Sequence, residues 1–410
     1  ADSIMIASVG EAAVSGVSLV DQIMVLLINI FAALATGGAV IAGQYLGHRK
    51  QDAACESANQ LVWFTTLSAV AITILVYVGK YVILHGIFGR IEADVMRHAD
   101  IYLIIVAMAI PFMAMYNAGA AIFRAMGNSK ISMNISILMN LINVGGNALL
   151  IYGFHMGTAG VAIPTLVSRI VAAVIIIALL CDEKQALHMK RTWRYRVDWS
   201  HVKKILSVGV PNGLENSMFQ LGKILVLSLV SSFGTYAIAA NAVGNSIALF
   251  QILPGMAINL AVTTVIARCV GAGDYEQVRY YNKKLIVITH IGISLMVFGV
   301  FAVLPMILKA YNLSAVTAEA TRNIIYFHGI SAILIWPSSF TLPSTFRASG
   351  DVQACMYISM ASMWIFRVAF SFILGKYLGM GVFGIWVAMV VDWAFRGICF
   401  WIRYYKGHWR

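Results

Sequence analysis

The chain has 410 residues, of which 60% are hydrophobic and 11% are charged, and its formal net charge is +12. Soluble domains usually carry about 25% charged residues, so this composition excludes a soluble globular protein and predicts an integral membrane protein. In a membrane protein an excess of Lys and Arg is a topology signal, and we expect no nucleic-acid partner.

The predicted elements begin with a short apolar stub over residues 1–8, which contains Asp2. Eleven longer apolar runs follow, each of the length that a helix needs to cross a bilayer. Helices are the spanning structure that fits such runs, so we expect an all-α fold. The longest runs exceed a straight span and are expected to tilt, or to bend at breakers such as Pro254-Gly255. The predicted spans are 17–46, 58–79, 101–123, 131–152, 158–181, 205–230, 237–267, 285–308, 324–346, 354–375 and 380–403.

The basic residues alternate between the loops. With the stub counted as helix 1, the loops after the even-numbered helices and the C-terminal tail hold nineteen Lys and Arg, against six in the odd-numbered loops. The positive-inside rule therefore places the even loops and the C-terminus in the cytoplasm. Twelve helices put both termini of the full-length protein inside, and we expect a multi-pass protein of the inner (plasma) membrane.

The sequence contains no signature of a metal site or of an enzyme. The five cysteines are odd in number and form no CxxC, and the histidines show no HxxxH or HExxH spacing. No GxSxG motif and no paired catalytic aspartates are present. We therefore expect no catalytic residue, no metal and no cofactor.

Two halves of the chain match at a nearly constant offset. The stretch FRAMGNSKISM (123–133) is similar to FRASGDVQACM (346–356), and MGTAGVA (156–162) is similar to MGVFGIW (380–386), 223 and 224 residues later. An even number of helices per half gives both halves the same orientation, related by a pseudo-twofold axis along the membrane normal. The offset places Ala1 opposite Leu225, deep in a span, so we expect most of helix 1 to be missing from this chain.

Seven stretches along the chain carry a family resemblance: ADSIMIASVG, FRAMGNSK, NLINVGGNALLIYG, GTAGVAIPTLVSR, GVPNGLENSMF, VIARCVGAGDYEQVR and VVDWAFRGICFWIRYYKGHW. With these stretches the chain resembles the multidrug and toxic compound extrusion (MATE) family of the MOP flippase superfamily.

The resemblance implies two six-helix lobes around a central cleft. It also implies alternating-access export of small, often cationic, organic drugs in exchange for Na⁺ or H⁺. The expected lobes are 1–182 and 205–410, joined by a basic cytoplasmic linker at 183–204, in a monomer surrounded by lipid.

Acids within membrane spans are costly, so each is a functional candidate. Asp2 is either a solvated terminus or the coupling carboxylate that the resemblance implies. Asn140, Asn143 and Asn147 lie at i, i+3 and i+7 and form one polar stripe, which lipid cannot satisfy. The stripe is either hydrogen-bonding glue between helices or, with Asn117 and Thr165, the cage around the helix 1 acid that the resemblance implies. Some relatives carry an acid where this chain has Asn147.

Two further acids are second candidates for coupling or for substrate binding. Glu215 is either a coupling or drug-binding acid, as the resemblance implies, or a structural carboxylate paired with Lys223 or a neighbouring helix. Lys223 is too far along the same helix for a direct bond. Asp21 either contributes to the cleft or makes a helix-packing hydrogen bond.

The remaining candidates concern the second half. Asp392 and Arg396 are spaced i, i+4 and are expected to form an ion pair that, with Arg367, holds the C-terminal lobe. Met and aromatic side chains suit a deformable cavity for organic molecules. The candidate cleft residues are Met218, Phe219, Phe250, Gln251 and Trp336.

A lipid or lipid-linked-glycan flippase of the same superfamily is the alternative function. That function would favour a more basic cleft and additional helices. A channel or receptor has no need of the long-range duplication with an acid near the first helix of each half.

Overall fold

The computed structural model describes residues 5–87 and 91–410, and Asp2 lies outside the described residues. The chain divides into two compact units, which we describe separately. Unit 1 comprises residues 1–46 and 50–213, and unit 2 comprises residues 47–49 and 214–410. Helix α8 contributes residues to both units. The predicted boundary at the basic linker 183–204 stays a prediction.

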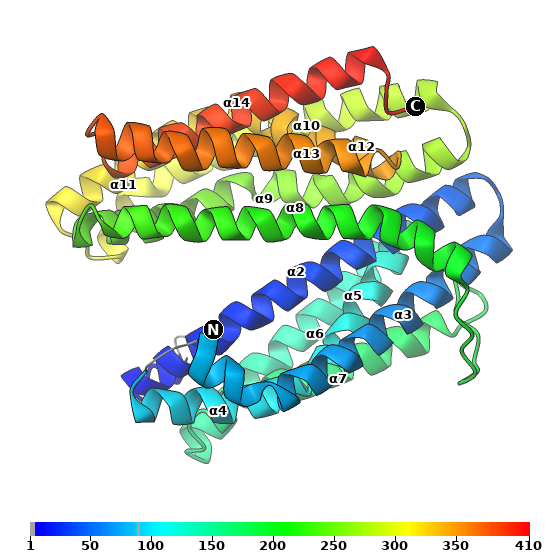
Figure 1. Cartoon of the computed structure of the whole chain (residues 1–410), viewed down its shortest axis with the longest axis horizontal. Helices are drawn as coiled ribbons and strands as arrows, with labels where there is room; N and C mark the ends of the chain where they lie inside the picture. The colour runs from blue at the N-terminus through cyan, green and yellow to red at the C-terminus, as the bar shows by residue number, and fades with distance from the viewer. Residues whose placement is uncertain (1–4, 88–90) are drawn as a thin grey trace. The chain divides into compact units, whose positions relative to one another are not determined.

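Unit 1 is a bundle of helices and contains no strand among its described residues (Figure 1). Its core is built from aliphatic and aromatic side chains such as Val17, Phe31 and Leu103, all of them buried. The elements are α2 (Glu11–Gly47), α3 (Gln51–Val78), η1 (Val82–Ile87), α4 (Ala93–Ala107), α5 (Ile110–Ala125), α6 (Ser129–Ala148), η2 (Leu149–Gly153), α7 (Ala159–Leu180) and the first part of α8 (Trp199–Ser231).

Unit 2 is a second all-helical bundle, in which several helices contain short π-helical segments, labelled η. A π-helical turn inserts an extra residue and is frequent at functional sites. The elements are the rest of α8, α9 (Thr235–Gly271), α10 (Tyr275–Ala310), α11 (Ala315–Trp336), η3 (Pro337–Thr341), α12 (Leu342–Ala348), α13 (Val352–Ser362), η4 (Met363–Ala369), η5 (Ser371–Tyr377) and α14 (Val382–Lys406).

The helices cover the spans that the hydropathy pattern predicts, and several extend beyond them. Among the described residues nine are long and apolar enough to cross a membrane, and a tenth is added if the bent pair α4–α5 is one span. One predicted run remains, 205–230, which lies in α8. This helix has 33 residues, but it is too polar to count as a membrane span by the same criterion of length and hydropathy. The all-helical membrane fold is confirmed, with α8 as its most polar long helix.

One predicted break occurs at a different place. Helix α9 runs without interruption through Pro254 and Gly255. The clear bend, of 49°, lies between α4 and α5, just before Pro111. Proline has no N–H to donate and its ring crowds the preceding turn, so the chain changes direction there.

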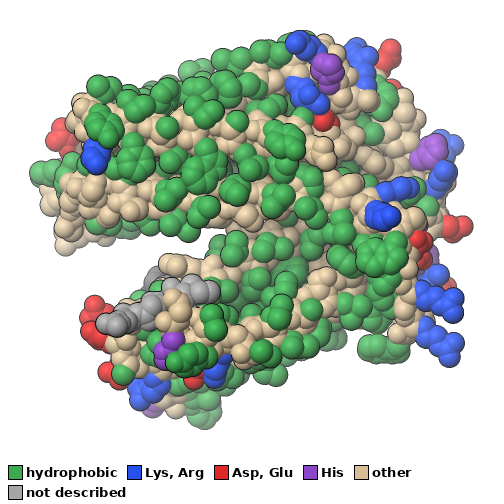
Figure 2. Space-filling model, viewed as in Figure 1, with side chains coloured by type: hydrophobic (Ala, Val, Ile, Leu, Met, Phe, Trp, Pro, Cys, Tyr) green, Lys and Arg blue, Asp and Glu red, His purple; other side chains and the backbone are tan. Residues whose placement is uncertain are grey.

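Charged and apolar side chains are segregated on each unit. Figure 2 shows hydrophobic side chains over the flanks of the helices and Lys, Arg, Asp and Glu gathered near the helix ends. An apolar flank and charged ends are what a helix bundle requires in a bilayer.

The basic linker folds back onto α3 within unit 1. The buried Gln60 side chain donates from Nε2 to the Arg196 carbonyl at 2.9 Å and accepts at Oε1 from the Tyr195 hydroxyl at 2.8 Å. Helix α8 begins directly after Asp198, which accepts two hydrogen bonds from Ser200. The side-chain bond from Ser200 is the largest cause of the lowered pKa of the Asp198 carboxyl.

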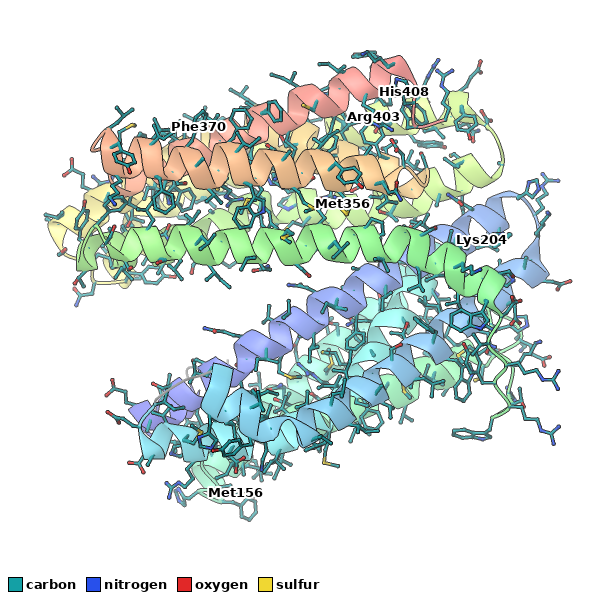
Figure 3. All side chains as sticks on the ribbon, in the orientation of Figure 1. Met156, Lys204, Met356, Phe370, Arg403 and His408 are labelled. Atoms are coloured by element: carbon teal, nitrogen blue, oxygen red, sulfur yellow. The ribbon has the colours of Figure 1, made fainter. Side chains whose placement is uncertain are left out.

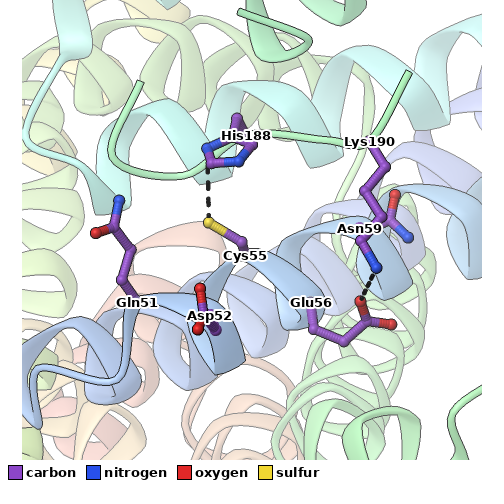
Figure 4. Close-up of a pocket in the computed structure, with 7 residues that line it drawn as sticks. All are labelled: Gln51, Asp52, Cys55, Glu56, Asn59, His188 and Lys190. Atoms are coloured by element: carbon purple, nitrogen blue, oxygen red, sulfur yellow. Dashed lines mark hydrogen bonds and ion pairs between the residues drawn. The ribbon is translucent and has the colours of Figure 1, made fainter. Parts of the chain in front are cut away.

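A polar pocket lies where the linker crosses α3 (Figure 4). Lys190 Nζ lies 3.7 Å from Glu56 Oε2, and Cys55 Sγ lies 3.8 Å from His188 Nδ1. Cys55 also donates to the Ala186 carbonyl. These contacts attach the linker to α3, and the side chains that make them are bound to one another or to the backbone of the linker.

We predict that Gly37→Ala destabilises unit 1. A Cβ at Gly37 would lie 2.6 Å from the Ile205 carbonyl oxygen and 2.8 Å from the Gly209 amide nitrogen, both on the backbone of α8. Backbone cannot move aside as a side chain does, so we expect a loss of about 1–3 kcal/mol, read as a lowered melting temperature of the purified protein.

The matched control is Gly145→Ala in α6, where a Cβ has no neighbour within 4 Å. This substitution is expected to be neutral or slightly stabilising, because Ala favours a helix over Gly. Equal melting temperatures for the two variants would contradict the close crossing of α2 and α8.

Candidate functional site

Helices α6 and α7 approach closely at one point in unit 1. A Cβ at Gly146 would lie 2.8 Å from the Pro164 side chain, so α6 needs a glycine at this crossing. The polar side chains on either side, Asn143 and Asn147 on α6 and Thr165 on α7, are thereby brought together.

The three side chains form a hydrogen-bonded chain. Asn147 Nδ2 donates to Asn143 Oδ1 at 2.9 Å, and Asn143 Nδ2 donates to Thr165 Oγ1 at 3.3 Å. Thr165 donates in turn to the Val161 carbonyl at 3.0 Å. Asn147 and Thr165 are buried, whereas Asn140, the first residue of the predicted stripe, is exposed. The structure therefore joins two residues of the stripe to Thr165.

The other members of the predicted cation site have different surroundings. Asn117 lies on α5, which packs against both α6 and α7, and its Nδ2 is buried without a hydrogen-bond partner among the described residues. Asp21 on α2 accepts a hydrogen bond from the Tyr102 hydroxyl at 2.8 Å. That contact joins α2 to α4. Asp21 therefore makes a helix-packing hydrogen bond, which was one of the two roles predicted for it.

Glu215 forms an ion pair in unit 2. Arg347 Nη2 donates to Glu215 Oε1 at 2.6 Å, and the Glu215 side chain is 8% exposed. The partner is a neighbouring helix, α12, rather than Lys223. Arg347 is counted above as a loop residue, but α12 extends to Ala348 and includes it. The sequence signal for this pair is the repeated FRA motif, which places an arginine at the end of a helix in each half.

Asp392 and Arg396 form an ion pair on α14. Arg396 Nη2 donates to both Asp392 oxygens at 3.2 Å, and both side chains are buried. Ser362 also donates to Asp392. A buried carboxylate with these partners is neutralised within its own bundle.

Phe219 lies at the centre of a group of cations. The ring centroid is 4.8 Å from Lys223 Nζ, 4.9 Å from Arg367 Cζ and 5.9 Å from Arg396 Cζ. Arg396 also lies 5.0 Å from the Phe340 ring. Phe219 was a candidate for the cleft, but its role as a platform for three cations depends on helices far apart in the sequence.

The other cleft candidates fall into two groups. Phe250 is 60% exposed and Met218 is half-buried. Gln251 is fully buried and hydrogen-bonded to His328 at 2.6 Å, and Trp336 is 3% exposed and stacked on Phe340. As placed, Gln251 and Trp336 are packing residues of unit 2. No group of His, Cys, Asp and Glu in the described part of the chain is arranged to hold a metal.

We predict that Glu215→Gln destabilises unit 2 by about 3–5 kcal/mol, because it leaves the largely buried Arg347 cation, whose side chain is 18% exposed, without a counter-charge. The effect is measured by heating the purified protein and following the loss of its monodisperse peak in size-exclusion chromatography. The double variant Glu215→Leu with Arg347→Met removes both charges and should recover most of the stability.

The matched control is the ion pair of Arg403 with Asp351, at 2.6 Å, whose side chains are 30% and 15% exposed. Arg403 lies near the C-terminal end of α14 (Figure 3). Asp351→Asn should cost about 1 kcal/mol or less, because solvent screens the charge that remains. A loss as large as that of Glu215→Gln would refute the burial argument.

Sequence comparison identifies relatives along the whole chain. The MatE family model matches residues 1–149 and 211–373. The uncharacterized transporter YisQ of Bacillus subtilis is 26% identical over 415 residues, covering 100% of this chain and 90% of the relative. The probable multidrug resistance protein NorM of Thermotoga maritima is 24% identical over 421 residues, covering 100% and 88%.

Structure comparison gives the same fold. A multidrug resistance MATE family transporter of the MOP superfamily, in its outward-facing conformation, superposes with a TM-score of 0.91 at 19% identity, covering 99% of this chain and 90% of that one. Because the family model matches more than half of the residues, this chain belongs to the MATE family of membrane transporters and is not an enzyme.

Proposed function

We propose that the protein is a secondary active antiporter that exports small organic molecules in exchange for Na⁺ or H⁺. The observation that carries the proposal is the hydrogen-bonded chain of Asn143, Asn147 and Thr165 in unit 1, in which Asn147 and Thr165 are buried. Such a group is costly inside a membrane bundle and marks an ion or substrate pathway.

The chemistry of this group suits a small cation. Amide and hydroxyl oxygens are neutral ligands of hard cations. In the family site, Asn117 on α5 would add a further amide and Asp2 would add one carboxylate. The same carboxylate alone would carry a proton. Asp2 lies outside the described residues, so its membership of the site rests on the family resemblance.

The export of drugs is supported by the relatives. The Thermotoga protein is described as a probable multidrug resistance protein, and the superposed transporter as a multidrug resistance protein. We extend this activity to the present chain, with alternating access of lobes 1–182 and 205–410 around a central cleft. We also propose a monomer in the plasma membrane with both termini in the cytoplasm. The flippase alternative finds no support among these relatives.

We predict that an inward Na⁺ or H⁺ gradient drives dye efflux and that Asn143→Ala lowers the rate at least tenfold. The substitution removes the amide that links Asn147 to Thr165, so the site loses its preorganised oxygens. Efflux is measured in proteoliposomes under separate Na⁺ and H⁺ gradients, with one cationic and one anionic dye.

Asn134→Ala, at an exposed position of the same helix, is the control and should retain the wild-type rate. Asp2→Asn should abolish coupled efflux. If neither gradient moves either dye, or if Asp2→Asn and Asn143→Ala both transport normally, the antiporter proposal fails.

A further inference from the structure

Three cationic side chains of unit 2 share one aromatic ring, and their charges are not balanced. The two acids within the predicted spans of unit 2, Glu215 and Asp392, are each bound to an arginine, Arg347 and Arg396. Two cations remain, Lys223 and Arg367. Asp392 also attracts Arg367, but it is already shared with Arg396 and Ser362.

Lys223 and Arg367 lie close together despite their like charge. Each is within 4.9 Å of the Phe219 ring centroid, so the two charged groups are at most about 9.7 Å apart (the sum of 4.8 and 4.9 Å). Neither forms an ion pair with any residue in the described ranges. At Gly222, next to Lys223, a Cβ would collide with the Met363 side chain of η4, so α8 and η4 are in close contact here.

The Lys223 side chain does not point toward the nearer membrane surface. It lies eight residues before the end of α8 at Ser231, about 12 Å along the helix axis. Its Nζ stacks on Phe219, four residues earlier, and therefore points away from that nearer helix end. The side chain is nevertheless exposed. An exposed ammonium at this depth is too costly in hydrocarbon, so this face of α8 must border water or a polar ligand.

Arg367 occupies a special position in the repeat. The offset of 224 residues places it opposite Asn143, the central residue of the oxygen-rich group in unit 1. It lies in the π-helical segment η4, and Phe340 lies in another, η3. The first half has neutral oxygen ligands at this position of the helix, and the second half has a cation.

We propose that Lys223 and Arg367, around Phe219, form a subsite for the acidic group of an aromatic or amphipathic organic anion. Arginine's planar fork suits carboxylate, sulfonate and phosphate oxygens, and Lys223 adds a mobile point charge. The Phe219 ring contacts both cations and so holds them in one place. This inference rests on the proposed function and names its substrate class, organic acids rather than organic cations.

The test is equilibrium binding by purified protein in detergent, with no ion gradient. Fluorescence anisotropy measures the Kd of the anion fluorescein and of the cation ethidium. We expect wild type to bind fluorescein more tightly, and Lys223→Gln and Arg367→Gln each to weaken it at least tenfold without weakening ethidium. Arg367→Lys, which keeps the charge, should retain part of the affinity.

Lys376→Gln is the matched control, because Lys376 also stacks on an aromatic ring of unit 2, that of Tyr377 at 5.9 Å, but at the end of a span. It should leave both affinities unchanged. The inference is overturned if wild type binds ethidium more tightly than fluorescein, or if Lys223→Gln leaves the fluorescein Kd unchanged. Lys223 is exposed, so the loss of its charge is not expected to impair folding.

Lipid nanodiscs with and without phosphatidylglycerol separate two sources of the anion. If phosphatidylglycerol competes with fluorescein, the natural ligand of the subsite is a lipid headgroup. If it does not compete, the ligand is a soluble acid. Either result supports an anion subsite. Because binding needs no gradient, fluorescein binding without coupled efflux would refute only the antiporter proposal. Coupled efflux of ethidium without fluorescein binding would refute only the anion subsite.

Discussion

The structure depends on one constraint, the cost of a polar or charged side chain inside an apolar helix bundle. Each unit meets this cost in its own way. Unit 1 links amides and a hydroxyl into a hydrogen-bonded chain, with Asn147 and Thr165 buried. Unit 2 pairs its two span carboxylates with arginines from the same bundle. The polar groups that remain after this pairing are the candidates for ion and substrate binding.

The internal repeat places the polar group of unit 1 and a cation of unit 2 at equivalent sequence positions. Asn143 and Arg367 occupy equivalent positions, and both lie on helices that end in π-helical segments. One half offers oxygen atoms to a cation and the other offers cations to an acid. Under the two proposals the halves divide the work, since unit 1 carries the coupling ion and unit 2 carries the charged group of the substrate.

Much of the fold follows from local sequence patterns. Apolar runs of span length predict the helices, because a bilayer requires backbone hydrogen bonds to be satisfied within the segment. The i, i+4 spacing of Asp392 and Arg396 determines that they can meet, because both lie on one helix face. The spacing of Asn143 and Asn147 likewise predicts one polar stripe, and the family resemblance added Thr165 and Asn117 to it.

Other features were decided only by tertiary structure. The pairing of Glu215 with Arg347 joins residues more than 100 positions apart. The same is true of the contacts of Arg367 and Arg396 with Phe219. Helix periodicity tells which face a residue occupies but not which helix packs against that face. For the same reason, the burial of Trp336 and Gln251 could not be predicted from the sequence. The sequence by itself therefore determined the helices, the repeat and the polar stripe, because these depend on neighbours along the chain. The partner of Glu215 and the cations around Phe219 from other helices were decided by packing, because they depend on which helices come into contact.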